Sequence, residues 1–231
     1  ALVFIMALFV VSIGGSLIAP KTGIDIEYLQ SLRRFILKRV KCGDRFVLIS
    51  GGGQIARAYQ NAARDVVGLT RDDLDWLGIH STRLNAHLLR TILRDVACPV
   101  ISKDPSRIRK TKLPVQVAAG WKPGWSTDYV AVRIAKRLKA NMVLNLSDID
   151  GVYDKDPRKF KNAKLVERIS WPDFREMVGS EWNPGAHVPF DPVASRLAHT
   201  SHIPVVVASG RDFKNIARIL DGKLFIGTKI E

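Results

Sequence analysis

The feature that most constrains the fold is the alternation of short apolar runs with longer amphipathic stretches along the 231 residues. Short apolar runs between turn signals are typical of buried strands, and apolar residues spaced three and four apart indicate helices. The expected strands are 8–13, 45–50, 99–101, 115–118, 142–146 and 204–208. The expected helices are 26–40, 54–63, 74–96 (as one or two helices), 128–138, 191–200 and 213–220. This order predicts an α/β fold, a three-layer α/β/α sandwich with a mostly parallel central sheet.

The composition is that of a globular chain without internal linkers. Hydrophobic residues make up 46% of the sequence, enough to bury a substantial core. We find no Pro/Ser-rich linker, low-complexity run or internal repeat that would separate two halves. We therefore expect one domain over residues 1–231.

The charge is strongly basic, with 36 Lys and Arg against 22 Asp and Glu and a net charge of +14. Such a surplus favours anionic partners such as nucleotides, nucleic acid or acidic lipid, but it is also compatible with an ordinary solvated surface. The basic residues are spread out and do not interleave with aromatic residues in one block. This distribution argues against nucleic acid as the main partner.

The two cysteines and the amino-terminal segment indicate a cytoplasmic protein without a membrane partner. Cys42 and Cys98 show no zinc-ligand spacing, and two thiols in a chain of this length favour a reducing compartment. Residues 1–13 are almost wholly apolar, but they are too short to span a bilayer. No basic segment precedes them and no cleavage-like site follows, so we expect a buried strand there.

Two glycine-rich corners follow expected strands, and in parallel sheets ligands bind at this edge. The first is Gly14-Gly15-Ser16. The second runs from Ser50 to Arg57 and places three glycines at the start of a helix, where N–H groups and the helix dipole bind anions. The second corner also matches a dinucleotide fingerprint, but the nearby acids at 72, 73 and 75 open a helix instead of ending a strand. No P-loop is present. Two corners on separate strands therefore suggest two anionic ligands.

Three later blocks carry polar chemistry at expected strand or helix ends. Residues 120–128 form a glycine-containing loop that ends in Ser126, Thr127 and Asp128, and residues 145–157 form an acid-rich segment. Asp191 followed by Pro192 is a strong helix start. Helix capping or a polar turn alone would also account for each of these blocks.

These blocks, in this order along essentially the whole chain, resemble the amino-acid-kinase superfamily, and within it the archaeal-type branch of the UMP kinases. The segments that carry the resemblance are 13–16, 51–57, 75–78, 82–86, 123–128, 150–157 and 191–192. The resemblance implies an amino-acid-kinase-like fold. It also implies an enzyme that phosphorylates UMP to UDP with ATP as the phosphate donor and Mg²⁺ as the metal ion. It also implies an acceptor-binding amino-terminal part, an ATP-binding part from about residue 141, and a homo-oligomer that is a hexamer built from dimers.

The resemblance assigns roles residue by residue. On the ATP side it implies Ser12, Gly14, Gly15, Ser16, Gly53, Arg57, Ser147, Asp148, Tyr153 and Asp156. On the acceptor side it implies Gly52, Asp75, Trp121, Lys122, Pro123, Gly124, Trp125, Ser126 and Thr127. Arg57, Asp128 and Asp191 are the implied catalytic residues, and both aspartates are implied to bind Mg²⁺.

The sequence also departs from the family pattern. Many members carry a lysine where this chain has Ser12, so the source of positive charge is open, and Lys122 is our catalytic candidate to replace it. Trp121 and Trp125 are bulky for this loop, and either stack on a base or narrow the pocket. Ser147 and Asp148 stand where a Thr-Asn pair is usual, which raises the possibility of a different phosphate donor.

Two other functions remain open at this point. One is a kinase of the same superfamily that acts on a small carboxylate or on isopentenyl phosphate, although segment 50–58 lacks the histidine expected for the latter. The other is a non-catalytic protein that binds a nucleotide or an oxoanion. The apolar face of helix 26–40 is a candidate subunit interface.

Overall fold

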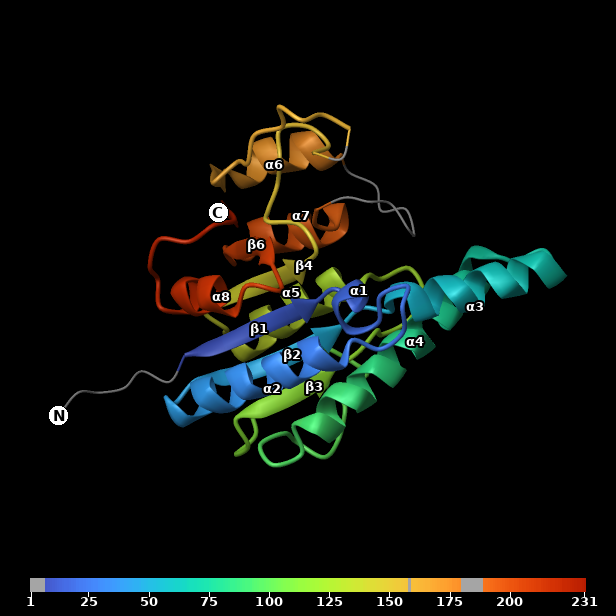
Figure 1. Cartoon of the computed structure of the whole chain (residues 1–231), viewed down its shortest axis with the longest axis horizontal. Helices are drawn as coiled ribbons and strands as arrows, with labels where there is room; N and C mark the ends of the chain where they lie inside the picture. The colour runs from blue at the N-terminus through green and yellow to red at the C-terminus, as the bar shows by residue number, and fades with distance from the viewer. Residues whose placement is uncertain (1–6, 158, 180–188) are drawn as a thin grey trace.

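The computed structural model describes residues 7–157, 159–179 and 189–231, and its core is a seven-stranded sheet (Figure 1). The strands are β1 (Leu8–Ile13), β2 (Arg45–Ser50), β3 (Val115–Ala118), β4 (Met142–Ser147), β5 (Arg168–Ile169), β6 (Val205–Ser209) and β7 (Thr228–Ile230). They lie in the order β3-β2-β1-β4-β6-β7-β5. All neighbouring pairs are parallel except β6 and β7. The predicted α/β architecture with a mostly parallel sheet is confirmed.

The described part of the chain contains eight helices, and all except α3 pack on the sheet. They are α1 (Gly15–Ile18), α2 (Ile26–Lys41), α3 (Gly53–Val66), α4 (Arg71–Ile92), α5 (Thr127–Leu138), α6 (Trp171–Val178), α7 (Pro192–Thr200) and α8 (Phe213–Leu220). One apolar core lies between the sheet and α1, α2, α4 and α8, and a second lies between the sheet and α5, α6 and α7. The two cores give the three layers. No described helix is long and apolar enough to cross a membrane.

The strands carry side chains alternately into the two cores, because successive residues of a strand point to opposite faces of a sheet. On β1, for example, Phe9 and Val11 enter the core under α2, whereas Val10 enters the core under α5. Strands buried on both faces read as continuous apolar runs. This is why the central strands were recognisable in the sequence.

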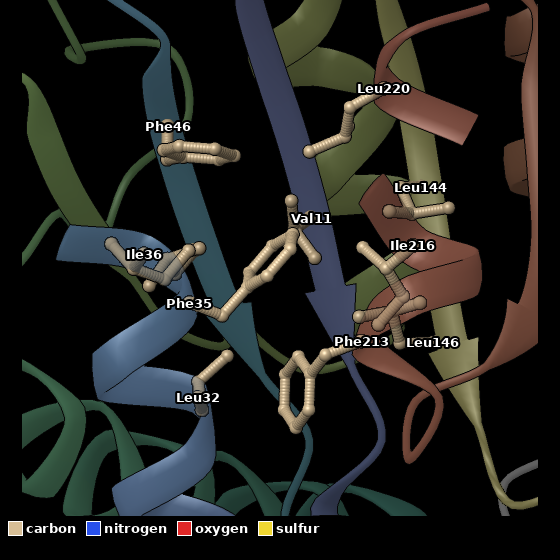
Figure 2. Close-up of a pocket in the computed structure, with 11 residues that line it drawn as sticks. Val11, Leu32, Phe35, Ile36, Phe46, Leu144, Leu146, Phe213, Ile216 and Leu220 are labelled. Carbon is tan, nitrogen blue, oxygen red and sulfur yellow. The ribbon is translucent and has the colours of Figure 1, made fainter. Parts of the chain in front are cut away.

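A narrow apolar cleft between α2 and α8 lies over the sheet (Figure 2). Phe35 and Phe213 face each other across it, with their ring centroids 5.3 Å apart. Its free volume is only about 10 Å³, which is the room of a single water molecule. The cleft is therefore a packing seam of the core. The apolar face of α2 packs on the sheet of its own chain and is not free to form a subunit interface as the sequence suggested.

Several boundaries and minor elements differ from the prediction. The expected strand 99–101 is wrong: only isolated bridges at Ala97 and Ser102 pair with β3, Pro99 has no N–H to donate, and Val100 is exposed. Segment 74–96 forms one helix, α4, that begins earlier and ends earlier than expected. No element was predicted at α1, β5, α6 or β7, which are two to eight residues long. Of the apolar segment 1–13, residues 1–6 lie outside the described residues.

Lys139 ends α5 in the left-handed conformation, with φ of 57°. The Ala140 N–H donates to the Ala135 carbonyl, a helix-end arrangement in which glycine is normally favoured. A left-handed non-glycine residue costs roughly 1–2 kcal/mol. We expect Lys139→Gly to raise the free energy of unfolding by about 0.5–1 kcal/mol in urea denaturation. Lys136→Gly, inside the same helix, is the matched control and should lower it by about 1 kcal/mol. A destabilised Lys139→Gly variant would contradict this interpretation.

Candidate active site

The two glycine corners of β1 and β2 lie in direct contact at the carboxyl edge of the sheet. A Cβ atom on Gly15 would lie 2.1 Å from the Gly53 nitrogen, and one on Gly51 would lie 2.7 Å from the Gly15 nitrogen. Gly53 has a φ of +62°, and the Gly51 N–H donates to the Ile13 carbonyl at 2.9 Å. Only glycines permit backbones to approach this closely. The two predicted anion sites therefore form one continuous surface.

Three helices longer than two turns begin around this surface. Helix α3 starts at Gly53, α5 starts after its N-cap Ser126, and α7 starts after its N-cap Asp191. A helix N-terminus presents free N–H groups and a partial positive charge, and it binds phosphate groups without any basic side chain. Their convergence favours a polyanionic ligand.

The two predicted catalytic aspartates lie side by side at the centre of the site. The Ser12 hydroxyl donates to Asp128 Oδ1 at 3.1 Å, and the Asp191 N–H donates to Asp128 Oδ2 at 3.3 Å. Asp191 is buried, and its carboxylate accepts the Ala194 N–H as the cap of α7. Residues 63 positions apart in the chain are thus brought together by the starts of α5 and α7.

The electrostatics of this pair favour a bound cation. Burial, and next the repulsion of Asp191, raise the pKa of Asp128 to about 7, although the Ser12 hydroxyl opposes the shift. Burial also raises the pKa of Asp191, against hydrogen bonds from Ala194, Ser126 and Val193. No described Lys or Arg side chain contributes to either shift. Two buried carboxylates without a cationic partner are expensive to ionise unless a cation joins them.

This donor set suits Mg²⁺ better than a metal held by protein alone. Mg²⁺ prefers oxygen ligands and is usually held by one or two carboxylates together with substrate phosphates. Among the described residues no group of three or more His, Cys, Asp or Glu side chains could form a closed metal cage. The pair Asp128 and Asp191 therefore fits the predicted Mg²⁺ and would share it with a phosphate ligand.

On the predicted acceptor side, helix α4 and the loop 120–126 face the second glycine corner. We call this loop the acceptor loop. Gly52 is in close contact with α4, since a Cβ there would lie 3.3 Å from the Gly78 carbonyl oxygen. Asp75 Oδ2 accepts the Gly124 N–H at 2.7 Å. The structure thus brings Gly52, Asp75 and Gly124 to one side of the site, and their role in binding the acceptor stays a prediction.

The two tryptophans of the acceptor loop pack against rings of the protein itself. Their rings lie 6.0 Å apart, and the Trp125 ring lies 4.0 Å from that of Tyr129 on α5. The Lys122 ammonium lies 4.6 Å over the Trp121 ring, and no described contact joins it to Ser12 or Asp128. The rings fix the loop to α5. The replacement of the usual lysine by Lys122 stays a prediction.

The remaining candidates for binding the acceptor or the phosphates lie at the starts of α5 and α3 and in the loop before α5. Ser126 accepts the Tyr129 N–H and hydrogen-bonds to Asp191, and Thr127 is the first residue of α5. Pro123 lies in the loop between Trp121 and Gly124. Arg57 is exposed one turn into α3 and donates to Gln54 Oε1 at 3.2 Å. Its long side chain is free to turn toward a phosphate.

The predicted ATP nucleoside residues follow β4 along the chain. Ser147 ends β4 and its hydroxyl accepts the Ile149 N–H, while Asp148 is exposed. Farther on, the Val152 N–H donates to the buried Thr228 hydroxyl of β7, which anchors the segment carrying Tyr153. The exposed Asp156 lies beyond it, and Ser16 lies in α1 beside the first corner. No described contact joins Tyr153 or Asp156 to the aspartate pair.

Sequence reasoning assigned no role to two buried amides that shape the site. Asn85 Nδ2 donates to the Gly51 carbonyl at 2.8 Å and so braces the second glycine corner. Asn145, the register partner of Ser12 on β4, donates to the Pro189 carbonyl at 3.0 Å, close to Asp191. A polar residue inside the apolar run 142–146 was the available signal, because buried polar groups are nearly always hydrogen-bonded.

The chain is similar to known kinases over almost its whole length. A model of the amino acid kinase family matches residues 7–209. A uridylate kinase of Thermoplasma volcanium is 36% identical over 96% of both chains, and one of Hyperthermus butylicus is 35% identical over 93% of this chain and 94% of the relative. The crystal structure of uridylate kinase from Archaeoglobus fulgidus superposes with a TM-score of 0.83 and 30% identity, covering 96% of this chain and 99% of that one. The chain belongs to the amino acid kinase family.

Proposed function

We propose that this chain transfers the γ-phosphoryl group of ATP to UMP and releases ADP and UDP. The observation that carries the proposal is the contact between the two glycine corners beside the aspartate pair. That geometry supports adjoining sites for two phosphate groups on one surface. The similarity to uridylate kinases supports UMP as the acceptor.

The chemistry requires positioning and charge stabilisation but no covalent intermediate. An oxygen of the UMP phosphate attacks the γ-phosphorus of ATP in line, and the bond to the oxygen bridging the β- and γ-phosphates breaks. The N–H groups at the starts of α1 and α3 would hold the phosphates, and Arg57 would turn onto their oxygens. Holding both reactants in this geometry would supply part of the rate acceleration, and charge stabilisation would supply the rest.

Asp128 and Asp191 would hold Mg²⁺ together with the phosphates. The bound ion supplies positive charge that neutralises the phosphate oxygens as they approach one another. Because Asp128 has a raised pKa, it must lose a proton to serve as a ligand. Ser12 keeps the Asp128 carboxylate oriented toward the site.

Five broader proposals rest on the resemblance and the sequence. The acceptor would bind to the amino-terminal part of the chain, and ATP to the part from about residue 141. We propose a single domain, a homohexamer built from dimers, and no role for nucleic acid. The free thiols Cys42 and Cys98 support a reducing, cytoplasmic location.

A coupled assay of ADP formation with the four common ribonucleoside monophosphates tests the proposed acceptor. We expect rapid ADP release that requires both UMP and Mg²⁺, with slower release from CMP and little from the purine nucleotides. ADP formation without any monophosphate, or with a purine nucleotide as the best acceptor, would contradict UMP kinase activity. Tight ATP binding with no turnover would instead identify a nucleotide-binding protein.

A further inference from the structure

Helix α4 holds the acceptor loop by its backbone at three points. The Thr82 hydroxyl accepts the Gly120 N–H at 2.8 Å, Arg83 donates to the Trp121 carbonyl at 3.0 Å, and Asp75 accepts the Gly124 N–H at 2.7 Å. We propose that this face of α4 is a clamp that fixes the acceptor loop, and that Arg83 is a positioning residue for the acceptor. The inference rests on the proposed function of the same site.

The spacing of the clamp residues follows from helix geometry. Residues 79, 82 and 83 follow Asp75 by four, seven and eight positions, so all four residues share one face of the helix. The loop backbone lies tightly against this face: a Cβ on Gly120 would lie 2.9 Å from Thr82 Oγ1 and 3.3 Å from Ile79 Cγ1. A side chain at position 120 would push the loop away from α4.

Of the three hydrogen bonds that form the clamp, the one from Arg83 has a charged donor and a loop carbonyl as its acceptor. Its guanidinium lies 5.9 Å from the Trp76 ring centroid, so a cation–π contact on its own helix steadies the side chain. Its Nε atom is buried and has no hydrogen-bond partner in the described part of the chain. Hydrogen bonds from charged donors are stronger than neutral ones. Arg83 is therefore placed to hold the backbone of the loop.

The opposite side of the loop is fixed by α5 through rings. The Trp125 ring packs on the Tyr129 ring, and Arg133 lies 5.8 Å from the Trp121 ring centroid. Contacts within the protein therefore hold the loop between two helices. A loop already ordered in its binding conformation loses less entropy when a ligand arrives. Loosening the clamp should weaken acceptor binding and leave ATP binding unchanged.

The test substitutes Arg83→Met, which keeps the length of the side chain but removes its donors. We expect the KM for UMP to rise about tenfold, with the KM for ATP and kcat within about twofold of wild type. Amide hydrogen exchange at Gly120 and Gly124 should become about tenfold faster. Arg83→Lys, which keeps one charged donor, should restore part of both effects.

Arg64→Met is the matched control, because Arg64 is exposed on α3 and, within the described residues, donates only to Asn61 of its own helix. It should leave the KM values and the exchange rates unchanged. Wild-type exchange at Gly120 and Gly124 in Arg83→Met, with an unchanged KM for UMP, would overturn the proposal. If the wild-type protein phosphorylates no nucleoside monophosphate, the proposed function fails, and the exchange rates alone decide whether the clamp exists.

Discussion

Asp128→Asn is expected to abolish turnover and at the same time to stabilise the folded protein. The variant removes the charge that would hold Mg²⁺ beside the phosphates, and losses of one such electrostatic contact lower kcat by about 100-fold or more. The amide can still pair with the Ser12 hydroxyl and the Asp191 N–H, so the fold should remain intact. An inactive but more stable variant would separate a catalytic role from a structural one.

The stabilisation should depend on pH in a defined direction. Burial and the repulsion of Asp191 raise the pKa of Asp128 from 3.8 to about 7 in the folded state. The folded protein therefore binds more protons than the unfolded chain between about pH 4 and 7, and the wild type loses stability as the pH rises through that window. The difference amounts to roughly 4 kcal/mol at most above pH 7. The Asp128→Asn variant should lack this contribution of Asp128 to the pH dependence of stability.

The measurement is urea denaturation without Mg²⁺ at several pH values, together with steady-state kinetics. Below about pH 4 the variant and the wild type should have similar free energies of unfolding, and above pH 7 the variant should be the more stable. Asp65→Asn, on the exposed side of α3, is the control and should change neither quantity. A destabilised Asp128→Asn protein at pH 8 would show that the carboxylate is ionised and paired in the fold.

Gly15→Ala is expected to destroy the site by separating the two glycine corners. The new Cβ would lie 2.1 Å from the Gly53 nitrogen and 2.6 Å from the Gly53 Cα, and backbone atoms cannot rotate out of the way as side chains do. Overpacking of this kind costs up to about 3 kcal/mol. A displacement of about 1 Å in the reacting groups lowers the rate by about 100-fold. We expect both effects.

Gly68→Ala is the matched control, because no atom lies within 4 Å of the position of its Cβ. Denaturation midpoints and kcat should be near wild type for Gly68→Ala and strongly reduced for Gly15→Ala. If Gly15→Ala retained wild-type kcat and stability, the contact between the corners would have no functional importance.

The sequence predicted the central architecture well because the information there is local. Strands buried on both faces give near-continuous apolar runs, so β1 and β2 have the predicted bounds. The edge strand β3 also has its predicted bounds, although Gln116 interrupts its apolar run. The edge strand β5 and its neighbour β7 were missed because they are two and three residues long and pair with each other across a long stretch of sequence. The wrong strand at 99–101 shows that an apolar run beside a proline is insufficient evidence for pairing.

The types of residue in the site could be predicted from the sequence, but most of the contacts between them could not. Glycines after strands and aspartates at helix starts are visible in a sequence, but the contact of Gly15 with Gly53 depends on the parallel pairing of β1 and β2. The contacts of Asn85 and Arg83 could not be predicted either. Their partners are backbone carbonyls of other segments, which no local pattern reveals.

Direct transfer between two neighbouring phosphates is the central claim, and a single turnover tests it. With enzyme in excess over ATP labelled in its γ-phosphate, and with UMP and Mg²⁺ present, we predict that the label passes from ATP to UDP in one kinetic step. Label trapped covalently on the protein, or released as inorganic phosphate while UMP stays unchanged, would contradict the claim.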